Sequence, residues 1–362
     1  MKQVDKLSVF FRDRKVGELT MTPDNQQCVF QYDKEWLSSG FSISPLELPL
    51  KSDMFIAKTE PFWGNFGIFE DSLPDGYGRY LLSRMLKKQG IDDSMLTPIQ
   101  RLSIVGISGM GALSYISESF AGEAKVLPEL DYLQQLALDV LSEKTDTGVD
   151  VLYFNSGNSG GCRPKCLYND KDGAWLVKFR HTYDPKDMGQ MEYRYNQIAY
   201  SCGIEVPDFK LLQGKYFASK RFDIENGERQ HIATACALLN EPISPPKLDY
   251  KILLHLTGYL TQNPIQVDEM FRRMVFNVLT ANKDDHAKNF SYICRNGKWL
   301  LSPAYDLTYS PGGYNNEHAT SVNGNGLPSI EDMLIVGESI HIPRKKGQAI
   351  IDYMIERCRE IM

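Results

Sequence analysis

The chain has 362 residues, of which 42% are hydrophobic and 24% are charged, and its formal net charge is −6. This length exceeds what one hydrophobic core usually serves, so two or three packed subdomains are expected. The ordinary composition excludes a disordered or fibrous chain, and the negative charge gives no general reason to expect direct binding to nucleic acid. These values are typical of a soluble enzyme.

The N-terminus and the cysteines predict a cytoplasmic protein. The apolar stretch near the N-terminus, LSVFF, is too short for the core of a signal peptide, and no later segment has the length of a membrane span. The seven cysteines are an odd number scattered along the chain, which fits a reducing compartment better than a disulfide framework. Cys162 and Cys166 could supply two metal ligands, but no second pair has zinc-finger spacing, so no zinc site is expected.

The front of the chain predicts a small β-rich module. Residues 6–32 contain short alternating stretches separated by turn-forming residues, which is the pattern of an antiparallel sheet. Pro74 stands just before an apolar-periodic run that ends at Gly90, which predicts a helix with start and stop signals. The segment RLSIVGISGMGALSYI is strand-like and closes the module. A linker over residues 122–128 follows, so residues 1–124 are predicted to form an N-terminal module.

The rest of the chain predicts a two-lobed core. After the Gly-rich stretch NSGNSGGCRPK come the strand-like AWLVKFR, a helix over residues 191–203 and a strand pair over residues 216–222. From about Leu248 the chain is mainly helical, interrupted by the short strands SYICR and KWLLSP. A β-rich lobe over residues 125–235 thus precedes an α-helical lobe over residues 236–362, and the fold class is α+β. Two-lobed phosphotransferases have this arrangement, although fold-level likeness alone does not settle function.

The strongest chemical pattern is ANKDDHAKNF followed by LLSPAYDLTYS. Phosphoryl transfer needs a carboxylate that orients the substrate hydroxyl, an amide oxygen that helps to hold Mg²⁺, and a second carboxylate on the metal. In protein kinases the catalytic Asp stands five residues before the metal-binding Asn, and Asp284 stands five before Asn289, whereas Asp285 stands only four before it. Asp306 follows the strand KWLLSP, where the second carboxylate is expected. The pattern therefore predicts Asp284 as the catalytic base and Asn289 and Asp306 as magnesium ligands.

The same residues also have a plainer interpretation, a helix end with acidic caps followed by an unrelated turn. The YDL string after a strand, and the apolar helix over residues 270–279 before the loop, favour catalysis over this interpretation. His286, inside the loop, could relay protons in catalysis, but a histidine so placed more often fixes the loop geometry through hydrogen bonds.

An ATP site also needs a backbone-rich loop over the phosphates and a lysine that pairs with them. Lys178 lies in the apolar strand AWLVKF, where a charged side chain needs a partner, and Glu192 could be that partner. Lys165 is the alternative lysine. A second Gly-rich segment, GISGMG, lacks a comparable lysine and glutamate, so it is interpreted as structural turns. The predicted ATP-binding residues are Ser156, Gly157, Ser159, Gly160, Gly161, Lys178 and Glu192.

These motifs resemble the HipA family, the kinase toxins of bacterial type II toxin–antitoxin systems. The strings VGELT, FEDSLPDGYGRYLL and RLSIVGISGMGAL are similar to the family's N-terminal coupling region, and NSGNSGGCRPK, WLVKF, KRFD, NKDDHAKNFS and LSPAYDL are similar to its kinase core. The resemblance covers nearly the whole chain, and the D-x-H-x-K-N-x-S string is its most distinctive part. It implies a serine/threonine protein kinase that uses ATP and Mg²⁺, with Asp284 as base, Asn289 and Asp306 on magnesium, and Lys178 on the ATP phosphates.

The resemblance also implies partners and a form of self-regulation. The expected partner is a HipB-like antitoxin, a small helix-turn-helix protein that binds DNA, so that the chain would contact DNA only through that complex. The expected substrate is an aminoacyl-tRNA synthetase, as in known members that phosphorylate glutamyl-tRNA synthetase. A serine of the Gly-rich loop, Ser156 or Ser159, is expected to be autophosphorylated, and its added negative charge would repel the phosphates of ATP.

Two other functions stay open. The chain could be a catalytically weak or inactive co-repressor that only binds a HipB-type antitoxin on operator DNA. The presence of Asp284, Asn289 and Asp306 favours the enzyme, because an inactive kinase usually lacks the base or a metal ligand. A small-molecule kinase would share the same metal chemistry, but it would leave the front module unexplained.

Overall fold

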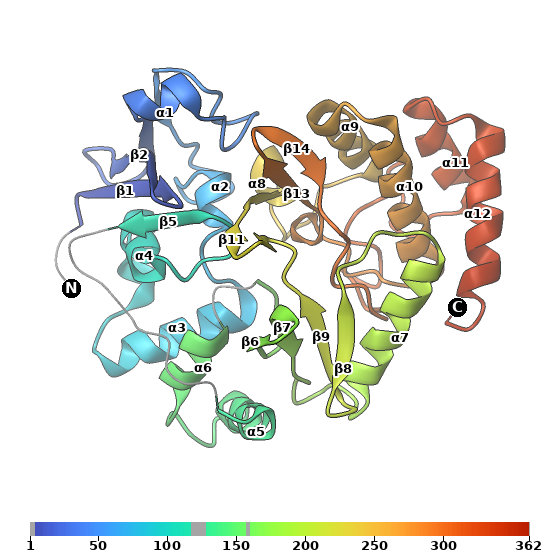
Figure 1. The fold of residues 1–362 in the computed structure, drawn as a ribbon, viewed down its shortest axis with the longest axis horizontal. Coiled ribbons are helices and arrows are strands. Elements are labelled where there is room, and N and C mark those ends of the chain that lie inside the picture. The colour runs from blue at the N-terminus through green and yellow to red at the C-terminus, as the bar shows by residue number, and fades with distance from the viewer. Residues whose placement is uncertain (1–3, 117–127, 157–159, 362) are drawn as a thin grey trace. The chain divides into compact units, whose positions relative to one another are not determined.

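The computed structural model describes residues 4–116, 128–156 and 160–361, so the predicted linker over 122–128 lies almost wholly outside the described residues. The chain divides into two compact units, whose helices and strands are labelled in Figure 1. The first comprises Met1–Gly189 with Lys210–Ile232, and the second comprises Gln190–Phe209 with Ala233–Met362. Helices and separate antiparallel sheets occur in both units, so the predicted α+β fold class is confirmed.

The first unit opens with a five-stranded sheet in the order β4-β3-β2-β1-β5. Its neighbouring strands are antiparallel, and β1 pairs with both β2 and the much later β5 through Val9, which lies opposite Gly17 and Tyr115. Leu7 and Val9 alternate with more exposed neighbours, as the period-two pattern predicts for a sheet with one buried face. The strands are β1 (Lys6–Phe11), β2 (Arg14–Met21), β3 (Cys28–Tyr32), β4 (Met54–Ile56) and β5 (Leu113–Ile116).

Short helices fill the connections of this sheet. The predicted helix after Pro74 is α3, and its end before the left-handed Gly90 matches the predicted stop signal. The strand-like interpretation of RLSIVGISGMGALSYI is wrong for its first part, which forms the end of α4. Thr97 and Gln100 form a capping box there and Pro98 occupies the first helical turn, and these local start signals outweigh the β-branched residues that follow. The helices are α1 (Lys34–Ser39), α2 (Gly67–Glu70), α3 (Gly76–Lys88), η1 (Asp93–Met95) and α4 (Pro98–Val105).

The first unit also contains a four-stranded sheet in the order β6-β7-β9-β8. It shares one hydrophobic core with helices α3, α5 and α6, to which Leu81, Leu133, Leu152 and Val177 contribute (Figure 1). The predicted strand pair over residues 216–222 is half right, because this range holds the single strand β9, and its neighbours β7 and β8 both precede it in the chain. The elements are α5 (Leu130–Leu141), α6 (Val149–Ser156), β6 (Lys165–Asp170), β7 (Gly173–Lys178), β8 (Phe209–Leu212) and β9 (Tyr216–Lys220).

A buried ion pair joins the end of β9 to the second Gly-rich segment, GISGMG. Arg221 donates through Nε to Asp223 Oδ1 over 2.9 Å, and the amide of Gly111 donates to Asp223 Oδ2 over 3.0 Å. Burial alone would raise the pKa of Asp223, but the hydrogen bond and charge of Arg221 outweigh it and leave that pKa below its usual value. The segment thus has a structural role in the first unit, next to the small hairpin of β10 (Ile224–Glu225) and β11 (Glu228–Arg229).

The second unit is mainly helical, with a three-stranded sheet in the order β12-β13-β14. Its central helix is α10, which starts at a cap by Asn263 and buries Phe271, Met274 and Phe276 against its neighbours. The two short strands predicted from SYICR and KWLLSP are confirmed as β13 and β14. The elements are α7 (Met188–Ser201), β12 (His231–Thr234), α8 (Ala235–Leu239), α9 (Tyr250–Thr261), α10 (Pro264–Leu279), η2 (Ala287–Asn289), β13 (Ser291–Arg295), β14 (Lys298–Leu301), α11 (Ile330–Ser339) and α12 (Arg344–Cys358).

The predicted division into residues 1–124, 125–235 and 236–362 stays a prediction. A compact unit can contain more than one domain, and the first unit holds both the front sheet and the sheet that contains Lys178.

Candidate active site

The loop that follows α10 carries two adjacent aspartates in opposite environments. The side chain of Asp284 is 60% exposed, whereas the side chain of Asp285 is fully buried. A carboxylate that accepts a proton from a bound substrate has to be accessible, so Asp284 meets this requirement and Asp285 does not. In the sequence, Asp284 was preferred over Asp285 as the base from the spacing to Asn289 alone. The exposure of the two side chains favours the same residue independently.

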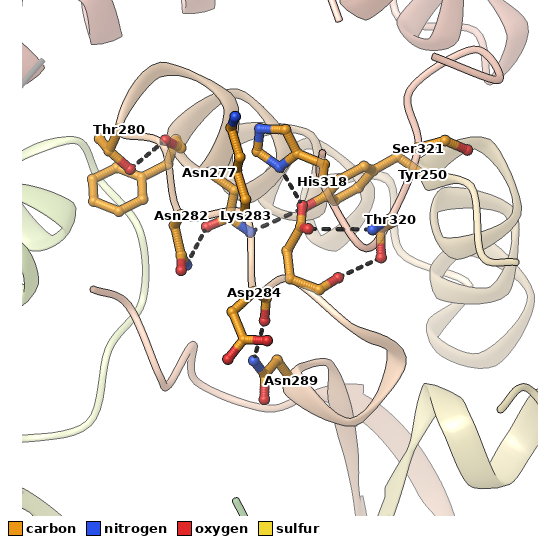
Figure 2. Close-up of polar contacts among 12 residues, drawn as sticks. Tyr250, Asn277, Thr280, Asn282, Lys283, Asp284, Asn289, His318, Thr320 and Ser321 are labelled. Carbon is orange, nitrogen blue, oxygen red and sulfur yellow. Dashed lines mark hydrogen bonds and ion pairs between the residues drawn. The ribbon is translucent and has the colours of Figure 1, made fainter. Parts of the chain in front are cut away.

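Asn289 lies at the end of η2 and closes the loop onto Asp284. Its side-chain amide nitrogen donates to the backbone carbonyl of Asp284 over 2.7 Å, and its amide oxygen points away from that carbonyl (Figure 2). This orientation presents an oxygen of the kind that Mg²⁺ prefers. The hydrogen bond spans the five-residue spacing from which the site was predicted.

His286 lies beside Asp284 but not in hydrogen-bonding contact with it. The His286 Nε2 atom is 4.0 Å from Asp284 Oδ1, and its Nδ1 atom is buried without a hydrogen-bond partner among the described residues. The predicted role in catalysis stays a prediction, since this geometry gives His286 an ionic contact with Asp284 only when the imidazole is protonated.

Asp306 is held close to the same loop by two contacts. Its backbone carbonyl accepts from the Asn282 side chain over 3.4 Å, and the hydroxyl of its neighbour Tyr305 donates to the Lys288 carbonyl over 2.7 Å. Asp306 has φ of 55°, in the left-handed region that costs a non-glycine residue roughly 1–2 kcal/mol. Such a conformation at a polar residue is typical of functional sites, where the surrounding structure enforces it.

The oxygen donors in this unit fit a hard cation rather than zinc. Asn289 offers an amide oxygen and Asp306 a carboxylate, the kinds of oxygen that Mg²⁺ prefers. The described residues contain no group of three His, Cys, Asp or Glu side chains that could hold a metal ion. The seven cysteines all lie in the described residues and form no disulfide there.

Of the two candidate serines of the Gly-rich stretch, Ser156 lies in the described residues and Ser159 does not. Ser156 ends α6, where its side chain is buried and its hydroxyl donates to the Tyr153 carbonyl over 3.1 Å. Phosphorylation at Ser156 would therefore require the end of α6 to open. The predicted residues Gly157 and Ser159 lie outside the described residues.

Of the two remaining glycines of this stretch, Gly161 is hydrogen-bonded to the start of α3 and Gly160 to Lys165. The amide of Gly161 donates to Asp75 Oδ1 over 2.6 Å, and the Gly161 carbonyl accepts from the amide of Tyr77 over 3.1 Å. Gly161 has φ of 94°, which a residue with a Cβ atom rarely adopts, and Gly160 accepts a hydrogen bond from the Lys165 ammonium.

Lys178, the predicted ATP lysine, and Lys165, its alternative, are neighbours in the folded chain. They lie directly opposite each other in the antiparallel pair of β6 and β7, so their side chains leave the same face of the sheet. Sequence reasoning missed this pairing. The signal was present in the two-residue turn at Lys171 and Asp172, which sets a register that places the two lysines opposite each other.

Glu192, the predicted partner of Lys178, is a buried residue of α7. The two residues belong to different compact units, and the predicted pair stays a prediction.

Comparisons with known proteins cover nearly the whole chain. Residues 7–116 match the family of HipA N-terminal domains, and residues 157–362 match the family of HipA-like C-terminal domains. The serine/threonine-protein kinase toxin HipA of Shewanella oneidensis is 23% identical to this chain, over 96% of this chain and 89% of the toxin. Y4dM of Sinorhizobium fredii, a protein named as a kinase, is 30% identical to this chain over 37% of each chain.

A solved structure shows the same fold. The complex of HipA, HipB and operator DNA from Shewanella oneidensis contains a chain that matches 98% of this chain, with 89% of its own length covered. The match has a TM-score of 0.73 and 20% sequence identity. Among the described residues, no helix has the length and apolar character needed to cross a membrane.

Proposed function

Because this chain belongs to the HipA family of serine/threonine-protein kinase toxins, we propose that Asp284, Asn289 and Asp306 carry its transfer of phosphate from ATP to a protein hydroxyl. The observation that carries the proposal is the pairing of an exposed Asp284 with Asn289, joined by one hydrogen bond in a loop that also contacts Asp306. The family membership agrees with the resemblance drawn from the motifs.

In the proposed mechanism the chain mainly positions the substrate hydroxyl and the ATP phosphates, and one of its carboxylates accepts or orients the hydroxyl proton. Asp284 accepts or orients the proton of the substrate hydroxyl, which its exposed carboxylate can reach. Asn289 and Asp306 would hold Mg²⁺, which when bound neutralises charge on the phosphates. Lys165 and Lys178 leave one face of their sheet as a pair of positive charges, and both are proposed to contact the phosphates of ATP.

The partners and the substrate are proposed from the family. The partner is a HipB-like helix-turn-helix antitoxin, and DNA is contacted through the complex with it. The substrate is a protein of translation such as an aminoacyl-tRNA synthetase, and the site of action is the cytoplasm. A serine of the Gly-rich loop is the proposed autophosphorylation site, with Ser156 and Ser159 as the two candidates; the burial of Ser156 makes its modification depend on local opening of α6.

The experiment that tests this function compares phosphate incorporation from ATP by the native chain and by Asp284→Asn. Because a general base contributes roughly 100-fold or more, incorporation should fall by at least that factor. The thermal unfolding midpoint should change little, since the side chain is largely exposed. Asp53→Asn, at another exposed aspartate, is the matched control and should incorporate phosphate like the native chain.

Mapping the labelled residue by mass spectrometry then distinguishes the two serines. Equal incorporation by the native chain and Asp284→Asn would remove Asp284 from the mechanism. Absence of both incorporation and ATP binding, measured by calorimetry on unphosphorylated protein, would instead support the co-repressor without kinase activity.

A further inference from the structure

Asp285, the buried member of the aspartate pair, is surrounded by hydrogen-bond donors. Its Oδ2 atom accepts from the Tyr250 hydroxyl over 2.8 Å and lies 2.9 Å from His318 Nδ1, and its Oδ1 atom accepts from the amide of Thr320 over 3.2 Å. The Thr320 hydroxyl also donates to the Asp285 backbone carbonyl. A fully buried carboxylate is costly unless it is paired and hydrogen-bonded, and here each oxygen has at least one partner.

Tyr250 extends these contacts to the far side of the loop. Burial, followed by the negative charge of Asp285, raises the pKa of Tyr250 well above its usual value, so the hydroxyl stays protonated and donates to Asp285. The same hydroxyl accepts from Asn277 Nδ2 over 2.9 Å, and Asn277 Oδ1 accepts from Asn282 Nδ2 over 2.9 Å (Figure 2). Asn282 also contacts the carbonyl of Asp306, so the chain of hydrogen bonds runs from Asp285, the neighbour of the predicted base, to the predicted metal ligand Asp306.

The segment that carries His318 and Thr320 runs beside the loop. The amide of Ala319 donates to the Lys283 carbonyl over 3.0 Å, and the Lys283 ammonium donates to the Asn316 carbonyl over 2.7 Å. His318 is itself buried, and its amide donates to the Gly326 carbonyl over 2.9 Å. Backbone contacts and the Asp285 carboxylate therefore restrain the loop on both sides of Asp284.

We propose that Asp285 is a positioning residue, and that the Asp285 network, consisting of Tyr250, Asn277, Asn282, Asp285, His318 and Thr320, holds Asp284 and Asp306 in their reactive arrangement. None of these six residues is proposed to touch the substrate. Asp285 acts through the backbone that it shares with Asp284, because hydrogen bonds to a charged group are strong and fix the direction in which the neighbouring side chain leaves.

The inference rests on the proposed kinase function, and it predicts a specific kinetic signature. A displacement of a catalytic group by about 1 Å can lower the rate roughly 100-fold without weakening substrate binding. Loosening the network should therefore lower kcat by roughly 10-fold to 100-fold and leave the KM for ATP within about twofold of the native value. A residue that only stabilises the fold would change the unfolding midpoint without this split between kcat and KM.

The test uses Tyr250→Phe and Asp285→Asn, with Tyr292→Phe as the matched control. Tyr292 is another fully buried tyrosine of the second unit, and its hydroxyl contacts Thr257, outside the network. Each Tyr→Phe change removes one buried hydroxyl and should therefore lower the thermal unfolding midpoint, by more for Tyr250→Phe because its hydroxyl donates to a charged carboxylate. Only Tyr250→Phe and Asp285→Asn should lower kcat and accelerate amide hydrogen exchange in residues 282–289.

Hydrogen exchange, measured by mass spectrometry, separates this inference from the proposed function. If the native chain shows no phosphate transfer, the proposed function fails, and exchange in the loop still decides whether the network restrains it. Native-like loop exchange in Tyr250→Phe and Asp285→Asn would overturn the inference whatever the activity. A kcat loss of the same size in Tyr292→Phe would also overturn it, because the effect would then be one of general stability. If Asp285→Asn does not fold, Tyr250→Phe carries the test.

Discussion

At the scale of single residues, the conformation of Asp306 matters as much as its charge. Its left-handed backbone, with φ of 55°, sets the direction in which the carboxylate leaves the chain. Asp and Asn tolerate this region better than other residues with a side chain, because their short polar groups can hydrogen-bond locally. An Asp306→Asn variant therefore removes the negative charge while it preserves the backbone, which Asp306→Ala would strain.

Asp306→Asn should raise the Mg²⁺ concentration needed for half-maximal phosphate transfer at least roughly 10-fold, because a carboxylate ligand is replaced by a neutral amide. The unfolding free energy should stay within about 0.5 kcal/mol of the native value. Titrating activity with Mg²⁺ checks the prediction. Asp284→Asn is the contrasting variant, since it should lower the maximal rate without shifting the Mg²⁺ midpoint. An unchanged midpoint in Asp306→Asn would argue against this residue as a metal ligand.

At the scale of elements, His231 at the start of β12 joins parts of the first unit that are distant in sequence. Its Nε2 atom lies 2.7 Å from the carbonyl oxygen of Ile43, in the loop after α1, and its ring is buried. Burial lowers the pKa of His231 from its ordinary value of 6.5 to about 4, and the contact with Ile43 only partly opposes this. The folded chain therefore keeps this imidazole neutral at pH values where the unfolded chain already binds a proton.

The stability of the first unit should consequently fall as the pH drops from about 6.5 to about 4. In this window the unfolded chain takes up a proton at His231 before the folded chain does. The free energy of unfolding should fall by as much as roughly 3 kcal/mol through this group. Above about 6.5 the contribution is fully present. Thermal unfolding at a series of pH values should show a shallower decline for His231→Gln than for the native chain. His255→Gln, at an exposed histidine of α9, should follow the native curve. Parallel curves for all three proteins would refute the assignment.

The hairpin of β6 and β7 also bears on the proposed function. A two-residue turn places Lys165 and Lys178 opposite each other, and it therefore brings two positive charges together on one face of the sheet. From the sequence, Lys178 was the predicted ATP lysine and Lys165 was its alternative. Lys165 is buried and its ammonium donates to the Gly160 carbonyl, so contact of both lysines with one phosphate chain requires Lys165 to leave that carbonyl.

At the scale of the whole molecule, the net charge of −6 bears on DNA binding. Nonspecific affinity for a duplex comes from phosphate neutralisation by Lys and Arg, and an acidic chain supplies little of it. We therefore expect the chain alone to bind the DNA upstream of its gene more weakly than about 10⁻⁵ M at roughly 0.15 M salt. Fluorescence anisotropy with a labelled duplex measures this. The proposed helix-turn-helix partner should restore binding, and tight binding by the chain alone would contradict the indirect contact.

Much of the site could be predicted because its essential spacing is local. The five-residue interval between Asp284 and Asn289 is a property of the chain itself, and one hydrogen bond in the folded loop spans that interval. The front sheet, α10 and the strands β13 and β14 were predictable for a similar reason, since the alternation and periodicity of apolar residues report which face is buried. The start of α4 was missed because a short capping signal competed with a β-branched run.

The family, most of the elements and the spacing of the reactive groups could be predicted from the chain alone, since these depend on residues close together in it. Only the tertiary structure decided that Asp284 is exposed while Asp285 is buried, that Tyr250 and His318 contact Asp285, and that Asp306 adopts a left-handed backbone. Burial and hydrogen bonding of this kind depend on segments that lie 33 to 35 positions from Asp285 along the chain. No local pattern reports such contacts, because they arise from the packing of whole elements against one another.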